Sequence, residues 1–288
     1  MHRTLSALLG IAFLAGAAPV ADAQTVRQAR QEVEASMLVT GHVDIDRDGR
    51  AASHVLDQPD KLPPYVVELI ARAVPSLRFE PVLVDGAPVI ARAKMSVRLV
   101  ATPAGDGEGN MQLRIASAHF GEEYSETDRT SVRQSNLRPP RYPMNIAQIG
   151  GKGTVYLLVK VGRDGKAADV VAEQVNLTAL GNARQMEMIR ATLSKTAVDN
   201  ALKHWTFTPP EEGEAVDRDY WVVRVPVDFR LSDDRDTAYG KWSAYHPGPQ
   251  QRPVWAAPTP PGFSPDTLVA GGMTPETSRF RLLTPIEG

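Results

Sequence analysis

Apolar and polar residues alternate along four stretches of the chain, and a period of two predicts β-strands that bury one face. Two stretches end in a glycine turn, at Asp48-Gly49 and Asp164-Gly165, which predicts tight hairpins because glycine tolerates a positive φ. The residues expected to face inward before these turns are Met37, Val39, Val43, Ile45, Val155, Leu157, Val159 and Val161. The inward residues of the two later, longer stretches are Val89, Ala91, Ala93, Met95, Val97, Leu99, Trp221, Val223, Val225, Val227, Phe229 and Leu231.

Between each hairpin and the following long strand, apolar residues recur every three or four positions, which predicts an amphipathic helix. Pro63-Pro64 suits the start of the first helix and Pro75 its end. The predicted apolar stripes are Val66, Ile70 and Val74 in the first helix, and Met186, Ile189, Leu193, Ala197, Ala201 and Trp205 in the second.

The two halves of the chain repeat the same landmarks in the same order. Residues 47–52 (RDGRAA) resemble residues 163–168 (RDGKAA), and each predicted helix is followed by a Phe-x-Pro sequence, at Phe79-Glu80-Pro81 and Phe207-Thr208-Pro209. Two copies in one order indicate duplication of one fold unit. Each unit is expected to be a hairpin, a helix packed on its inner face and a closing strand. The predicted fold class is therefore α+β, with two small antiparallel units in tandem.

The pattern divides the chain into five parts. The expected ranges are 1–23 for a signal peptide, 24–103 for the first unit, 104–135 for a linker, 136–232 for the second unit and 233–288 for a tail. The linker contains one alternating piece, 111–118, which is compatible with a strand. Prolines are frequent in the tail, so it is expected to be extended and mobile. Its aromatic residues leave docking on the body of the protein open: Trp242, Tyr245, Trp255 and Phe263.

Composition and charge narrow the function further. The formal net charge is −2, which argues against binding to nucleic acid or to anionic membranes in general. The chain has no cysteine, which excludes disulfides, thiol catalysis, iron–sulfur clusters and cysteine-ligated zinc. Arg3, a short apolar stretch over 5–18 and Ala21-Asp22-Ala23 are typical of a cleaved signal peptide, so the mature chain is expected to begin at Gln24. An uncleaved membrane anchor is the alternative.

Five short motifs follow one another in the second half, and together they are specific enough to indicate a family. They are Arg141-Tyr142-Pro143, Gly153-Thr154-Val155, Asp164-Gly165-Lys166, residues 201–209 (ALKHWTFTP) and residues 225–229 (VPVDF). On these residues the stretch 138–231, about a third of the chain, resembles the C-terminal domain of the TonB energy-transducer family. The stretch 37–100 is a fainter second copy that lacks the Tyr-Pro entry.

The resemblance implies a periplasmic module that recognises an outer-membrane transporter or another envelope protein. In that family a short extended peptide of the transporter adds as a strand to the sheet. Pro226 independently favours an edge position, because proline cannot donate to a strand ladder, and unpaired edge groups can receive a peptide. Alternatively, Pro226 only guards the edge against aggregation, and Tyr142 only pins the entry chain. The expected partner-binding residues are Arg141, Tyr142, Pro143, Arg224, Pro226, Asp228 and Arg230.

The chain also departs from that family. A transducer keeps its membrane helix and places a Pro-rich spacer before its domain, whereas here the Pro-rich stretch follows it. A detached module cannot exert force, so a membrane-anchored transducer in the inner membrane is only an alternative. A structural envelope protein whose tail fills its own strand edge is another. The first unit is expected to serve as a scaffold or to form a homodimer.

No catalytic, cofactor or metal site is expected. Asp44-Ile45-Asp46-Arg47-Asp48-Gly49 begins like a calcium loop, but Val55 stands where the bidentate glutamate belongs. His42 and His54 could face each other across the first hairpin and hold a metal, yet no third ligand is evident. Nucleophile, zinc-protease and phosphate-loop motifs are absent, so the protein is expected not to be an enzyme.

Overall fold

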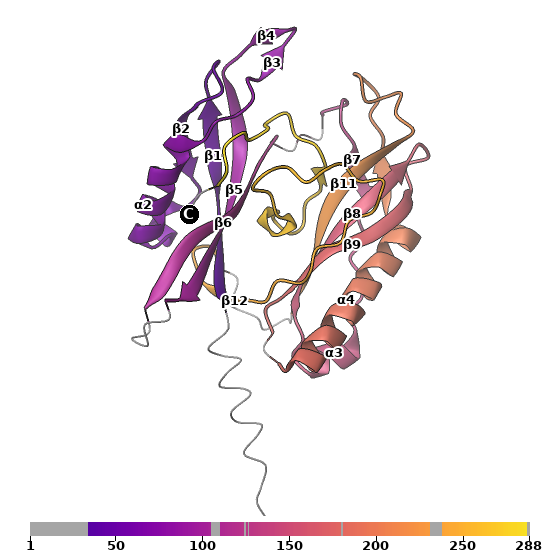
Figure 1. The fold of residues 1–288 in the computed structure, drawn as a ribbon. Coiled ribbons are helices and arrows are strands. Elements are labelled where there is room, and N and C mark those ends of the chain that lie inside the picture. Colours follow the sequence, from indigo (N-terminus) through magenta and orange to yellow (C-terminus); the bar gives the residue numbers. More distant parts are fainter. Residues whose placement is uncertain are drawn as a thin grey trace, which may run out of the picture.

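The computed structural model contains two antiparallel sheets that face each other, with the C-terminal tail between them and a helix on the outer side of each (Figure 1). The structure describes residues 34–104, 110–123, 125, 127–179, 181–230 and 238–286. The predicted signal peptide and Leu231 lie outside these ranges. The fold is mixed α+β with mostly antiparallel strands, as the alternation predicts.

The first sheet has the strand order β12-β1-β5-β6, and β2 also pairs with β1. Its strands are β1 (Glu34–Ile45), β2 (Ala51–Leu56), β5 (Ala91–Pro103), β6 (Met111–Gly121) and β12 (Ser243–Tyr245). Helix α2 (Pro64–Ala73) covers one face, and its apolar stripe of Val66, Ile70 and the following Val74 is buried as predicted. The remaining elements here are the hairpin of β3 (Leu83–Val84) and β4 (Ala87–Pro88), and 3₁₀ turns at Pro59–Lys61 and Val74–Ser76.

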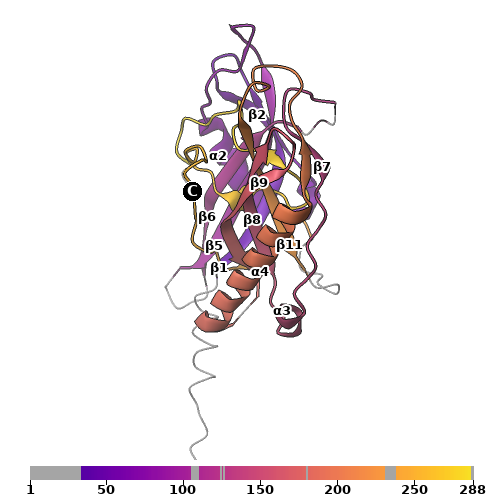
Figure 2. The same ribbon diagram turned by 90° about the vertical axis from the view of Figure 1, so that its right-hand side faces the viewer.

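The second sheet has the strand order β13-β11-β8-β9. Its strands are β8 (Gly153–Gly162), β9 (Ala167–Leu177), β11 (Tyr220–Phe229) and β13 (Thr274–Pro275). Helix α4 (Ala183–His204) crosses the outward face (Figure 2), and the Asn182 side chain caps its start by accepting from the Gln185 N–H at 2.9 Å. Outside this sheet lie α3 (Met144–Gln148), the pair β7 (Arg133–Asn136) and β10 (Thr206–Thr208), and a 3₁₀ turn at Pro265–Thr267.

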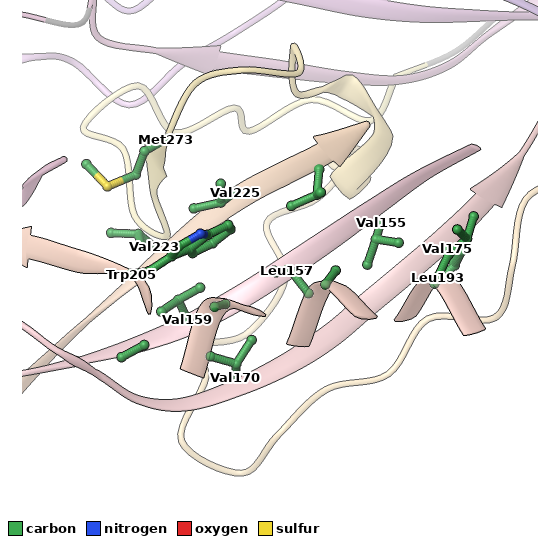
Figure 3. Close-up of a cluster of buried hydrophobic side chains, with 14 of the residues drawn as sticks. Val155, Leu157, Val159, Val170, Val175, Leu193, Trp205, Val223, Val225 and Met273 are labelled. Atoms are coloured by element: carbon green, nitrogen blue, oxygen red, sulfur yellow. The ribbon is translucent and has the colours of Figure 1, made fainter. Parts of the chain in front are cut away.

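Each sheet and its helix enclose a separate apolar core. The inward faces predicted for β1 and β8 are confirmed, whereas the predicted inward residues Val89, Ala91 and Met186 are only partly buried. All four inward residues of β1 and all four of β8 are buried in these cores. Figure 3 shows the second core, in which side chains of β8, β9 and β11 meet α4 and the Trp205 that ends it. Burial of such side chains stabilises each layer by roughly 1.5–3 kcal/mol per large residue.

The two hairpin turns make the same contact with the Phe-x-Pro sequence that follows each helix. The N–H of Phe79 donates to the carbonyl of Gly49 at 2.7 Å, and the N–H of Phe207 donates to the carbonyl of Gly165 at 2.7 Å. Both glycines have positive φ, of 79° and 74°, and a Cβ on either would come within 2.4 Å of the phenylalanine carbonyl oxygen. The repeated landmarks therefore touch each other in both halves, and only glycine fits there.

The described part of the predicted linker contributes to two strands. Residues 104–135 contribute all of β6, which pairs with β5 from Lys94 to Pro103, and the first residues of β7. The alternating piece 111–118 gave part of this strand, but a strand pattern alone does not name the strand it pairs with. The stretch expected to be a linker with one possible strand thus contributes a full strand to the first sheet.

The predicted mobile tail instead lies along several strand edges. Its β12 pairs with β1, its His246 bridges to Leu177 at the end of β9, and Gly262 accepts from Ala118 of β6 at 2.9 Å. Prolines suit this role because such a segment needs few backbone bonds of its own. The tail thereby covers backbone groups that would otherwise be open to other chains.

A buried carboxylate fixes the tail between the sheets. Asp266 is 1% exposed. Its carboxylate accepts from Asn176 of the second sheet at 3.3 Å and from Tyr245, and its backbone carbonyl accepts from Arg98 of the first sheet. Burial, with the nearby carboxylate, raises the pKa of Tyr245. The tail thus joins the two sheets through a polar network whose members satisfy one another.

Candidate functional site

Within the described ranges, strand pairing on the outer edge of β11 is limited to the start of the strand. The tail strand β13 pairs with Val223 and Arg224, and the N–H of Glu276 donates to the carbonyl of Val222 at 3.0 Å. On the other side β11 pairs with β8 along its whole length, from Tyr220 to Phe229. No other described strand pairs with the outer edge of β11, so its second half is an unpaired edge.

Alternation of the backbone identifies the groups that this edge presents. In an antiparallel strand the N–H and carbonyl of one residue point the same way, and the direction alternates along the chain. Val222 points to the outer edge, so Pro226 and Asp228 do as well. Pro226 therefore sits where its missing N–H costs no bond to β8, which is the edge position that its sequence context predicts. Asp228 presents both its backbone N–H and its backbone carbonyl to this outer edge.

A cavity of about 800 Å³ lies beside this open half of the edge. One wall is β11 from Val225 to Phe229, and another is β7 with the segment that follows it. Its lining includes Leu137, Pro139, Pro140, Tyr142 and Trp205. We call this cavity the β11 groove. Its aromatic and proline surfaces suit a ligand with apolar side chains.

The Tyr142 ring is fixed at the end of the groove. It meets the ring of Phe229 edge-on, with the ring centroids 5.6 Å apart, and its hydroxyl donates to the carbonyl of Gly151. The ring thus lines the groove, and its hydroxyl also holds the entry chain.

Charged side chains at the groove are already paired. Asp228 accepts from Thr154 at 3.0 Å and from Arg230. Arg133 donates to Glu211 at 3.0 Å. These pairs leave the groove close to neutral, which favours recognition through backbone groups and apolar contacts over charge.

The structure brings together four of the seven predicted partner-binding residues. Tyr142, Pro226, Asp228 and Arg230 line the β11 groove. Arg141 and Pro143 are not among its lining residues, and Pro143 instead precedes α3 as its N-cap.

Arg224 is placed differently from the prediction. The residue is 2% exposed, and its guanidinium forms a two-bond ion pair with Glu173 of β9, at 2.7 and 3.0 Å, between the sheets. The sequence period puts Arg224 on the same face as Pro226, but it does not reveal that the first sheet and the tail cover this face. Such a buried pair is structural, because removing one partner leaves the other charge buried and unpaired.

Sequence reasoning missed groove residues outside the alternating strands. The prediction counted Trp205 only as core, although it also lines the groove, and it counted Gln134 and Ser135 as linker. The consecutive prolines Pro139-Pro140 were a usable signal, because they hold an extended segment beside the sheet.

The metal-site alternatives are explained by other contacts. Arg92 donates two bonds to Asp44, and these bonds, with one from Ser53, lower the pKa of Asp44 to about 2. The strand register pairs His42 with Val55 and Val43 with His54, so the two histidines point to opposite faces. Within the described ranges, no three His, Cys, Asp or Glu side chains gather into a group that could hold a metal ion.

A second cavity, of about 610 Å³, opens between the sheets and is lined in part by His119 of β6. Burial, with a smaller contribution from the charge of Arg224, lowers the pKa of His119 to about 4. The ring of Phe263 lies 5.6 Å from the His119 ring. A histidine that is neutral at pH 7 beside a paired arginine is consistent with a structural role.

Comparison with known proteins gives no relative, since no family model, curated protein or solved structure matches the chain. Among the residues that the structure describes, no helix is both long and apolar enough to cross a bilayer.

Proposed function

We propose that the chain is a periplasmic binding module of the TonB C-terminal type, built from two related units, which captures an extended peptide of an envelope protein as an added strand on β11. An outer-membrane transporter is the partner that the resemblance favours. The role is recognition rather than catalysis.

The observation that carries this proposal is the difference between two corresponding edges. In both units the first strand lies between its hairpin partner and the closing strand, as β2-β1-β5 and as β9-β8-β11. The outer edge of β5 is filled by β6 over ten residue pairs, from Lys94↔Gly121 to Pro103↔Met111. The same edge of β11 has two residue pairs and then the groove. The edge of β5 supports the proposal, because within this chain it holds a full antiparallel strand.

The geometry supports an antiparallel ligand. Both β6 on β5 and β13 on β11 run antiparallel to the strand that they join. A peptide in the β11 groove would bond to the carbonyl of Pro226 and to both backbone groups of Asp228. Each such bond contributes about 0.5–1.5 kcal/mol, so side-chain contacts with the aromatic lining supply the rest of the affinity.

The test separates the Asp228 backbone from its side chain. Asp228→Pro removes the outward N–H, and Asp228→Ala removes the carboxylate but keeps the N–H. Extended peptides from transporters would be titrated against the full chain by fluorescence anisotropy. We expect Asp228→Pro to weaken the best peptide by about two- to tenfold relative to Asp228→Ala, which corresponds to one lost backbone bond. Equal affinities for the two variants would exclude strand addition at this edge.

A structural envelope role is the second candidate, because the tail does occupy strand edges of both sheets. The structural role predicts that no peptide binds, because the tail already pairs with the strand edges that the fold leaves open.

A further inference from the structure

A short segment of the tail, Met273–Glu276, occupies the near end of the edge at which the β11 groove begins. The Met273 side chain is 8% exposed and belongs to the second core. Figure 3 places it beside Val223 and Val225 of β11, on the side of the sheet that carries Trp205. The tail therefore inserts an apolar side chain into the core over the edge of the sheet.

The backbone of this segment pairs as a ligand strand would. Thr274 lies opposite Arg224 and Pro275 opposite Val223. Val223 points its backbone groups toward β8, so the residue opposite it has no bond to donate and proline is accepted there. Glu276 then donates its N–H to the carbonyl of Val222 at 3.0 Å.

Two firmly buried points hold the tail on either side of the segment. Asp266 precedes it, in the polar network between the sheets. Phe280 and Leu282 follow it and are buried in the first core. Release of Met273–Glu276 would therefore leave the rest of the tail in place, and the segment would remain close enough to compete with any ligand.

The chain beside the segment is built to turn. Gly271 lines the groove with φ +89°, and Cβ atoms added at Gly271 or Gly272 would meet nothing within 4 Å. The open space on the Cβ side of both glycines, together with the conformational freedom of glycine, allows the chain to turn there. The opposing restraints lie at Glu276, whose carboxylate accepts from the Ala257 N–H at 2.7 Å and whose carbonyl accepts from Arg224 at 3.2 Å.

From these contacts we propose that Met273–Glu276 is an internal copy of the ligand. Ligands of the β11 groove are extended peptides that carry a long apolar side chain at the position of Met273, run antiparallel to β11 and displace this segment when they bind the whole edge. This inference rests on the proposed function, and it adds the chemical class of the ligand and the competitor that regulates access.

The experiment uses the full chain and a labelled peptide with the sequence of residues 270–277, AGGMTPET, together with the same peptide carrying Ser in place of Met. Three proteins are compared: the wild type, Met273→Ser, and the control Met111→Ser, which changes an exposed methionine of β6 that does not line the groove. We expect Met273→Ser to bind the Met peptide at least about tenfold more tightly than the wild type and the control, because its own segment competes less well. The Ser peptide should bind none of them measurably.

Two results would overturn the inference: equal binding of the Met peptide to the wild type and Met273→Ser, or equal binding of the Met and Ser peptides to Met273→Ser. Near-ultraviolet circular dichroism of Met273→Ser establishes that its core remains folded. The Asp228 pair of variants is independent of this experiment. Transporter peptides that bind in an Asp228-dependent way while Met273→Ser behaves as the wild type would leave the proposed function standing and remove only the internal ligand.

Discussion

The closing strands β5 and β11 hold the same place in their sheets but have different outer neighbours. β6 covers β5 and brings Ile115, Ala118 and Phe120 into the first core. From the tail, the second core receives Met273. The difference teaches that each sheet takes apolar side chains from a strand added at this edge, and that the strand added to β11 covers much less of the edge than the one added to β5.

The largest expected effect concerns the side chains that the added strands contribute. Phe120 meets Phe79 edge-on, with ring centroids 4.8 Å apart, inside the first core. Phe120→Ala should lower the free energy of unfolding by about 3–5 kcal/mol, and Met273→Ala by about 2 kcal/mol, because the tail segment can relax at its glycines. Urea unfolding of both variants measures this. A larger loss for Met273→Ala would mean that β13 is as integral to its sheet as β6 is.

Proline substitution sharpens the same comparison at the backbone. Ser96 of β5 lies between Thr40 of β1 and His119 of β6, so a proline there breaks a ladder bond on one side or the other. Ser96→Pro should destabilise the fold by about 3 kcal/mol relative to Ser96→Ala. Asp228→Pro should stay within about 1 kcal/mol of Asp228→Ala, since its outward N–H has no strand partner. Similar losses in chemical denaturation would contradict the open edge.

Acid should lower the free energy of unfolding through His119 of β6, the strand that covers the outer edge of β5. Its pKa is lowered from 6.5 to about 4 by burial and by Arg224, so the unfolded chain takes up this proton first as the pH falls. The stability that the neutral ring provides is complete above pH 6.5 and is lost as the pH falls toward 4, by up to about 3 kcal/mol. His119→Gln should remove this part of the pH dependence. A stability difference between wild type and variant that is the same at pH 7 and pH 4.5 would refute it.

Local patterns predicted the elements, and nonlocal contacts decided what the patterns left open. The period of two identified the buried faces of β1 and β8, because burial on one side of a strand leaves a direct trace in the sequence. The groove was predicted in part, since Pro226 and Tyr142 carry conformational or aromatic signals of their own.

The remaining features depend on residues far apart in the chain. Arg224 shares a face with Pro226, yet only the packing of the second sheet against Asp266 and the tail makes that face an interior. The alternation of 111–118 gave a strand but not its partner, and nothing local in the tail specified the edges along which it lies. Pairing and docking are set by complementarity between distant segments, which a one-dimensional pattern does not contain.

The contacts of the tail with both sheets also affect how the chain folds. The hydroxyl of Tyr239 bonds to the carbonyl of Thr40, 199 positions away, and Arg281 pairs with Glu80 across 201 positions. Contacts between residues so far apart in the sequence require a large loss of chain entropy, so they form late and slowly. Each sheet can pack against its own helix before the tail has paired with the strand edges. During that interval the unfinished edges are the part of the molecule most exposed to aggregation, and a chaperone would protect the chain most effectively by covering them.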